Sequence, residues 1–199
     1  TYPASSTGLT GVIPTWVQEG GHNAWINRMK EPKARMRLLK DIREELSQQP
    51  PEGILMVGFK NPSMADKYQG KTIAEASEMR KQSPEETIID MIIEDDSRIQ
   101  CIYFSMSDEN IKKKIKLPWV SFCSDAGSYS DPKEGFRTHP RAYGSFIRVL
   151  GKFSRDENLL SLEEAIRKLS GLPASNLGLK DRGLLKENYF GDVVIFDPN

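Results

Sequence analysis

Two charged side chains in the second half of the chain could take part in chemistry. Asp125 directly follows the apolar run 119–124, which Pro118 bounds and which predicts a short buried strand. Arg141 follows a long loop rich in glycine and serine, where a helix is predicted to begin. A carboxylate at the C-terminal end of a parallel strand lies where α/β folds keep their reactive groups. The same aspartate would also serve as an ordinary turn cap.

The elements around these two residues follow from hydrophobic spacing. Apolar residues at helical spacing predict a helix over 142–153: Tyr143, Phe146, Val149, Leu150 and Phe153. A capping box of Ser161 and Glu164 begins another helix, and four of its residues are expected to face the core: Leu162, Ala165, Ile166 and Leu169. Residues 192–197 predict a final strand.

The first half of the chain alternates predicted helices and strands. Residues 1–30 are expected to form loop with short helical pieces, and 60–71 a polar linker. Helices are predicted over 32–48, 72–81, 84–94 and 109–116, and strands over 54–59 and 99–104. The strand at 99–104, the helix at 109–116 and the strand at 119–124 predict a βαβ unit with a right-handed parallel crossover. The fold class expected is therefore α/β.

Composition narrows the function classes. The chain has 199 residues with 28 Lys plus Arg and 28 Asp plus Glu, so nothing in its charge favours nucleic acid or an anionic membrane. No apolar run approaches the ~18 residues of a membrane span, and the start carries no signal-peptide pattern. Cys101 and Cys123 both fall in predicted strands, where buried free thiols are expected. A cytoplasmic location is expected.

Several sequence words occur together and in order along nearly the whole chain. They are ASSTGL at 4–9, IPTW at 13–16, SD at 124–125, HPRAYGSF at 139–146, RVLGK at 148–152, LSLEEAIRK at 160–168 and DVVIFDP at 192–198. With these words the chain resembles the metal-dependent N-acyl-D-amino-acid deacylases (D-aminoacylases) of the amidohydrolase superfamily. Each word alone is weak, and the ordered set is specific.

The resemblance implies a fold larger than this chain. Family members combine a (β/α)₈ TIM barrel, which typically takes about 250 residues, with a small β-sandwich. Their metal ligands include a His-x-His and lie upstream of the matching segments, whereas His22 and His139 match no ligand position. The chain is thus expected to be a C-terminal portion. Residues 1–180 would belong to the barrel, with an inserted helical segment, and 181–199 to the β-sandwich.

The resemblance also implies the site residues. Asp125 matches the catalytic carboxylate that takes a proton from a metal-bound water and passes it to the amine. Arg141 would bind the substrate carboxylate with two parallel hydrogen bonds, and its alternative is a structural ion pair. Ser6 and Tyr2 would contact substrate, although ordinary turn chemistry also explains a serine there.

Metal binding and partners complete the expectations. Zinc is expected in the complete enzyme and none on this chain alone, which would be inactive by itself. His139 is expected to orient the loop before Pro140, and a metal site of Cys123, Asp125 and His139 is the weaker alternative because four placed ligands are not evident. The expected partner is a small N-acyl amino acid, with a homo-oligomer or association with an N-terminal half left open.

The leading functional hypothesis is a zinc-dependent deacylase of N-acyl-D-amino acids. One alternative is a cyclic amidase similar to dihydroorotase or hydantoinase, which would need no capture of a substrate carboxylate. The other alternative is a non-catalytic fragment that lacks the metal ligands and only folds with a partner.

Overall fold

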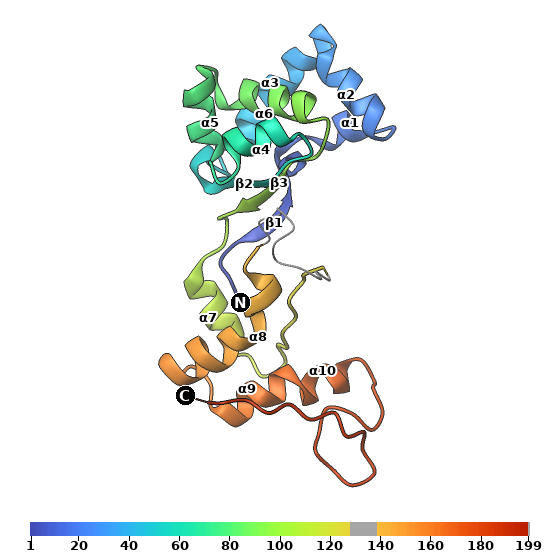
Figure 1. Cartoon of the computed structure of the whole chain (residues 1–199), viewed down its shortest axis with the longest axis vertical. Coiled ribbons are helices and arrows are strands. Elements are labelled where there is room, and N and C mark those ends of the chain that lie inside the picture. The colour runs from blue at the N-terminus through green and yellow to red at the C-terminus, as the bar shows by residue number, and fades with distance from the viewer. Residues whose placement is uncertain (128–138, 199) are drawn as a thin grey trace. The chain divides into compact units, whose positions relative to one another are not determined.

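The computed structural model of the chain describes residues 1–127 and 139–198. Most of the predicted loop between Asp125 and Arg141, residues 128–138, lies outside the described residues. The described chain forms two compact units (Figure 1). Unit 1 contains residues 1–3, 106–127 and 139–198, and unit 2 contains residues 4–105. Each unit has its own core and is considered by itself.

Unit 2 is built on a three-stranded sheet in the order β1 (Ser5–Gly8), β3 (Gln100–Tyr103), β2 (Ile54–Gly58). Both strand pairs are antiparallel. The parallel crossover predicted from 99–104 to 119–124 is wrong, because the described residues 119–124 form no strand. Three helices connect β2 to β3, and they return the chain to the end of the sheet where β2 leaves it. There Gly58 lies opposite Gln100. β1, expected to be loop, is also a strand.

Helices cover the sheet of unit 2 (Figure 1). Their bounds are η1 (Leu9–Val12), α1 (Thr15–Gln18), α2 (His22–Lys30), α3 (Pro32–Leu46), η2 (Pro51–Gly53), α4 (Pro62–Tyr68), α5 (Ile73–Arg80) and α6 (Pro84–Asp95). The predicted helices α3, α5 and α6 are confirmed, and Ser83 and Glu86 form the expected capping box of α6. The polar linker was expected to lack structure but contains α4, which the Asn61 side chain caps.

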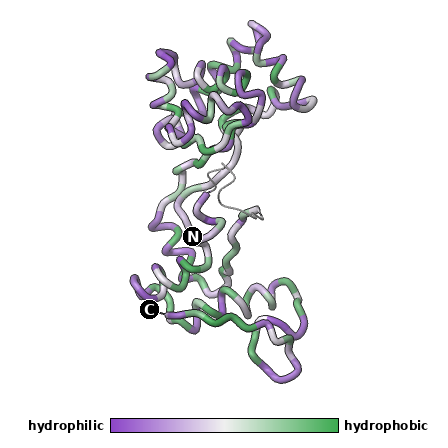
Figure 2. Tube along the Cα trace, in the orientation of Figure 1, coloured by the Kyte–Doolittle hydropathy of each residue, from purple (hydrophilic) through white to green (hydrophobic). Residues whose placement is uncertain are grey.

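The core of unit 2 lies between the helices and the sheet. Along the helices hydrophilic and hydrophobic residues alternate, as expected for elements with one buried face (Figure 2). Leu38 and Ile42 of α3, Ile88 and Ile92 of α6 and Met56 of β2 are among the buried residues of one cluster. Burying an aliphatic side chain of this size contributes about 1.5–3 kcal/mol, so this cluster holds the helices on the sheet.

Unit 1 is helical in its described residues. It contains α7 (Asp108–Ile115), α8 (Arg141–Arg148), the π-helix η3 (Val149–Asp156), α9 (Leu162–Leu169) and α10 (Gly171–Asn176). The helix predicted over 142–153 is therefore α8 continued by η3. Among the described residues, 119–124 and 192–197 form no strand, so both strand predictions are wrong here. A strand needs a neighbouring backbone, and the side chain of Ile195 is 93% exposed.

The core of unit 1 is small and differs from the predicted one. Ile115 of α7, Phe153 of η3 and Ala165 of α9 are buried together. Leu162 and Ile166, which were expected to face this core, are exposed, and Lys168 is buried instead. Lys168 is buried because its ammonium group donates hydrogen bonds to the backbone carbonyls of Leu117 and Val120.

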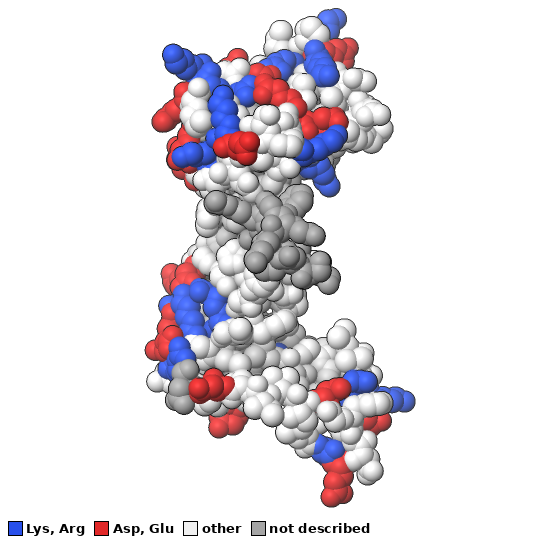
Figure 3. Space-filling model, in the orientation of Figure 1, with Lys and Arg blue, Asp and Glu red and all other residues white. Residues whose placement is uncertain are grey.

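The cysteines, the surface charges and the hydropathy bear on the expectations from composition. Both cysteines are free, but Cys101 alone is buried in a strand, because Cys123 is exposed and belongs to no strand. Acidic and basic side chains are intermixed on the visible face of each unit (Figure 3). Within residues 1–127 and 139–198, none of the helices has the length and apolarity that a membrane crossing needs.

Candidate functional site

Unit 1 joins Asp125 and Arg141 in an ion pair. The Nη1 atom of Arg141 lies 2.8 Å from Oδ2 of Asp125. The aspartate comes from the segment after α7 and the arginine from the start of α8, so the pair connects two separate parts of the chain. The Asp125 side chain is 78% exposed and that of Arg141 is 22% exposed. The carboxylate is thus open to solvent, while the guanidinium is held against the protein.

The backbone of Asp125 has an unusual conformation. Its φ angle is +50°, in the left-handed region that few residues other than glycine adopt. Aspartate and asparagine tolerate this region better than most side chains. The Ala126 amide donates a hydrogen bond to the Ser124 hydroxyl at 3.3 Å, which helps to shape the bend. Six other non-glycine residues in the described part of the chain also have positive φ, so this conformation alone does not mark Asp125 as functional.

Arg141 is held by the first turn of α8. Its amide donates a hydrogen bond to Nδ1 of His139 at 3.0 Å, so the buried imidazole satisfies one of the free amides at the helix start. The Arg141 carbonyl accepts a hydrogen bond from the Ser145 hydroxyl at 2.8 Å. These contacts fix the start of α8, whereas the loop that His139 was expected to orient lies largely outside the described residues, so that role stays a prediction.

The alternative metal site of Cys123, Asp125 and His139 gains no support. The Nδ1 atom of His139 accepts the Arg141 amide and is not available to a metal. In the described part of the chain, no three His, Cys, Asp or Glu side chains lie together in a way that could hold a metal ion.

Tyr2 lies against α8 in the same unit. Its ring contacts the His139 imidazole edge-on, with centroids 5.4 Å apart, and the Arg148 guanidinium lies 4.6 Å from the ring centroid. The tyrosine hydroxyl packs on Gly144, where a Cβ atom would lie only 2.2 Å from Oη. Gly144 follows Arg141 by one helical turn. Unit 1 therefore brings Tyr2, Asp125 and Arg141 to the region around the start of α8.

Ser6 belongs to unit 2, where it lies opposite Ile102 in the sheet. Its hydroxyl accepts a hydrogen bond from Nε2 of Gln100 at 2.9 Å. Because successive side chains of a strand point to opposite faces, Ser5 and Thr7 point away from Ser6. The contact of Ser6 with substrate stays a prediction.

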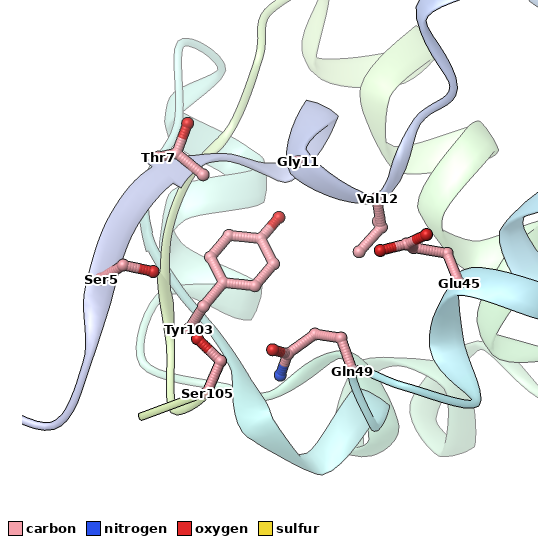
Figure 4. A pocket seen from close by; sticks show the side chains of 8 residues that line it. All are labelled: Ser5, Thr7, Gly11, Val12, Glu45, Gln49, Tyr103 and Ser105. Carbon is pink, nitrogen blue, oxygen red and sulfur yellow. The ribbon is translucent and has the colours of Figure 1, made fainter. Parts of the chain in front are cut away.

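A small pocket lies on the Ser5 and Thr7 side of the sheet in unit 2, with a volume of about 210 Å³ (Figure 4). The Tyr103 ring lies among its lining side chains, and the Tyr103 hydroxyl donates a hydrogen bond to the Gly8 carbonyl at 2.9 Å. Burial raises the pKa of Tyr103 above its ordinary value, which already lies well above neutral pH. None of the residues predicted to act in chemistry lines this pocket.

Sequence reasoning missed two residues of α9 that contact the segment before Asp125. Lys168 donates hydrogen bonds to the carbonyls of Leu117 and Val120, and Arg167 donates to that of Pro118. A signal for Lys168 was available, since it follows the buried Ala165 by three residues and so falls on the same helix face.

Similarity to known proteins follows the division into units. Residues 106–199, which begin where the main part of unit 1 begins, match the amidohydrolase family. The N-acyl-D-aspartate deacylase of Alcaligenes xylosoxydans xylosoxydans is 42% identical over 97 residues, covering 49% of this chain and 18% of the relative. About half of the chain is thus similar to N-acyl-D-amino-acid deacylases. It spans about a fifth of the length of that curated deacylase.

Solved deacylase structures match the whole chain. The N-acyl-D-glutamate deacylase of Bordetella bronchiseptica, solved with zinc and a phosphonate inhibitor, gives a TM-score of 0.67 at 24% identity and covers 100% of this chain and 32% of its own. A D-aminoacylase with a binuclear metal centre gives a TM-score of 0.66 at 26% identity, covering 99% of this chain and 32% of its own. The structural similarity to these amidohydrolases thus extends over unit 2 as well as unit 1.

Proposed function

We propose that this chain is the C-terminal portion of a zinc-dependent hydrolase that removes the acyl group from N-acyl-D-amino acids. The observation that carries the proposal is that the general acid–base candidate Asp125 and the carboxylate-binding candidate Arg141 lie 2.8 Å apart. Their ion pair is also what the structural alternative for Arg141 expects, and the Arg141→Lys variant tests between the two roles. The similarity to a curated N-acyl-D-aspartate deacylase supports the same reaction class.

Arg141 fits the recognition of a linear N-acyl amino acid, which carries a free α-carboxylate. A guanidinium presents five N–H donors in a planar fork. In the described part of the chain the ion pair to Asp125 uses Nη1. The substrate carboxylate would bind the remaining donors and compete with Asp125 for the guanidinium. A cyclic amide has no such carboxylate, so this arginine favours the linear substrate.

Asp125 fits the proton transfers of amide hydrolysis. A water molecule attacks the carbonyl carbon, and the carboxylate accepts the proton that the water loses. The protonated carboxyl group then gives this proton to the leaving nitrogen as the C–N bond breaks. The exposed carboxylate of Asp125 is accessible to both a water molecule and a substrate.

The zinc site and the remainder of the barrel would lie outside this chain. The described residues hold no group of three metal ligands, and we propose that residues outside this chain hold the zinc. The C-terminal barrel portion, the boundary at residue 180 and the cytoplasmic location stay predictions. We expect no catalytic zinc on this chain alone, and one tightly held zinc per chain after dialysis would contradict this.

The test uses the complete protein that contains this chain. Acetate release is measured with N-acetyl-D-aspartate, N-acetyl-D-glutamate and N-acetyl-D-methionine, with the L-enantiomers as stereochemical controls and hydantoin and dihydroorotate as cyclic amides. Hydrolysis of at least one D-substrate in preference to its enantiomer is expected. Hydrolysis of the cyclic amides alone would favour the cyclic amidase, and no turnover with zinc present would favour the non-catalytic alternative.

A further inference from the structure

We infer that Lys168 and Arg167 of α9 are positioning residues that fix the turn at 117–120 and so hold Asp125 in place. This inference rests on the proposed function of Asp125 as the proton-transferring group. It adds to that proposal two residues that need not touch the substrate.

Three carbonyls of one turn accept hydrogen bonds from these two cations. Nζ of Lys168 donates to the Leu117 carbonyl in a short contact and to the Val120 carbonyl at 3.0 Å, and Nη2 of Arg167 donates to the Pro118 carbonyl at 2.7 Å. Hydrogen bonds from charged donors are stronger than neutral ones. We name these three contacts the carbonyl clamp.

Glu164 holds the charged groups of the carbonyl clamp in place. Its carboxylate binds Nε and Nη2 of Arg167 at 2.7 and 2.8 Å, and one of its oxygens lies 3.9 Å from Nζ of Lys168. Burial lowers the pKa of Lys168, as expected for an ammonium taken out of water. Glu164 follows Ser161 by three residues, and its amide is capped by that serine, so the first turn of α9 fixes its position.

The burial of Lys168 is what distinguishes the carbonyl clamp from an ordinary surface contact. The Lys168 side chain has no exposed area, whereas lysine is almost never fully buried unless it is paired. An apolar residue there would fill the space but would leave the Leu117 and Val120 carbonyls without this donor. The lysine is therefore explained by the carbonyls that it binds.

The segment between the carbonyl clamp and Asp125 has little structure of its own. In the described part of the chain, residues 121–127 form neither helix nor strand, and Phe122 is only partly buried against the core. Asp125 contacts Arg141, and along the chain the turn at 117–120 is the nearest preceding segment that side chains of another element hold in place. When the substrate carboxylate binds Arg141 in place of Asp125, the carbonyl clamp and Phe122 are the contacts that still hold the segment carrying Asp125.

The experiment compares Lys168→Met with the parent in the complete protein. Methionine keeps the length of the side chain and removes the three donors. Because misplacing a reacting group by about 1 Å can cost about 10²-fold in rate, kcat for the best N-acetyl-D-amino acid should fall about 10- to 100-fold. KM should change less than about threefold, since Arg141 still binds the carboxylate.

Two controls separate positioning from loss of stability. Ala165→Gly weakens α9 at a buried neighbour but leaves the carbonyl clamp intact, so the melting temperature should fall while kcat stays within about twofold. Arg167→Lys can still donate to the Pro118 carbonyl and should retain most of the kcat that Arg167→Met loses. The arginine pair also tests the inference if Lys168→Met fails to fold.

The double variant Lys168→Met with Asp125→Asn gives the decisive reading. If Lys168 acts through Asp125, the double variant should be no slower than Asp125→Asn alone. A multiplicative loss, or a parental kcat in both Lys168→Met and Arg167→Met beside a slow Asp125→Asn, would overturn the inference and leave the proposed function standing. A parental kcat in Asp125→Asn would overturn the proposed function, and the inference with it.

Discussion

Replacing Asp125 by asparagine should remove catalysis and leave the fold. Asparagine has nearly the same size and also tolerates the left-handed backbone found at this position. The substitution removes the ion pair with Arg141, in which the aspartate side chain is 78% exposed. Exposed ion pairs contribute about 0–1 kcal/mol. We therefore expect the free energy of unfolding to fall by less than about 1 kcal/mol.

The expected loss of activity is larger than this loss of stability. General acid–base catalysis typically contributes about 10²–10⁴-fold, which corresponds to about 2.7–5.4 kcal/mol at 1.36 kcal/mol for each factor of ten. One group serves here as base and then as acid, so the loss should reach the upper part of this range. A residue that only capped the turn would lower the activity no more than its loss of stability accounts for, so a barrier increase several times larger than the destabilisation points to the carboxylate itself.

The assay measures kcat, melting temperature and metal content of the complete protein and its Asp125→Asn variant. Asp125→Gly is the matched control, because glycine adopts positive φ without strain and lacks the carboxylate. Both variants should lose activity to a similar extent. If metal content and melting temperature survive while kcat of Asp125→Asn falls less than about tenfold, Asp125 is a turn residue and the proposal is wrong.

Three further predictions concern other residues. Arg141→Lys keeps the charge but loses the planar fork, so it should mainly raise KM for an N-acyl-D-amino acid, and an unchanged kcat/KM would count against carboxylate binding. Gly144→Ala should displace the Tyr2 hydroxyl, whereas in a Tyr2→Phe background the same change should stabilise α8 by up to about 1 kcal/mol, which a thermodynamic cycle of melting experiments would measure. The pKa of Asp96 falls from 3.8 to about 2 because Lys60 and then His22 bind it by hydrogen bonds. Its stabilising contribution should thus be present above pH 4 and lost towards pH 2, and Lys60→Met should flatten this loss in the melting temperature. Equal pH profiles of parent and variant would refute the assignment.

The sequence was most informative where a structural element is specified locally. Pro32 begins α3, and Ser83 with Glu86 caps α6, because these signals act within one helical turn. The direction of β3 relative to β2 could not be predicted in this way, since it depends on where three helices return the chain. The Asp95 carboxylate accepts hydrogen bonds from the backbone amides of Lys60 and Asn61. These bonds connect the end of α6 to the segment that follows β2.

The candidate site was predicted in part because its chemistry stands in recognisable sequence words. Asp125 and Arg141 were named from such words, and the structure joins them in one ion pair. The contact of Gly144 with the Tyr2 hydroxyl could not be predicted, because the two residues are far apart in sequence. The strand before Asp125 was predicted wrongly for a related reason: an apolar run becomes a strand only where another backbone pairs with it.

In helix α9 the hydrophobic periodicity predicted the wrong buried residues, and hydrogen bonding to a neighbouring turn explains the difference. An amphipathic pattern assumes that the core selects apolar side chains, which would bury Leu162 and Ile166. Yet the turn at 117–120 presents the carbonyls of Leu117 and Val120 to the buried ammonium of Lys168, which donates a hydrogen bond to each of them. Lysine offers three donors at the end of a flexible chain, whereas leucine offers none. The buried face of α9 is thus set by the backbone it packs against, which the sequence of the helix alone does not contain.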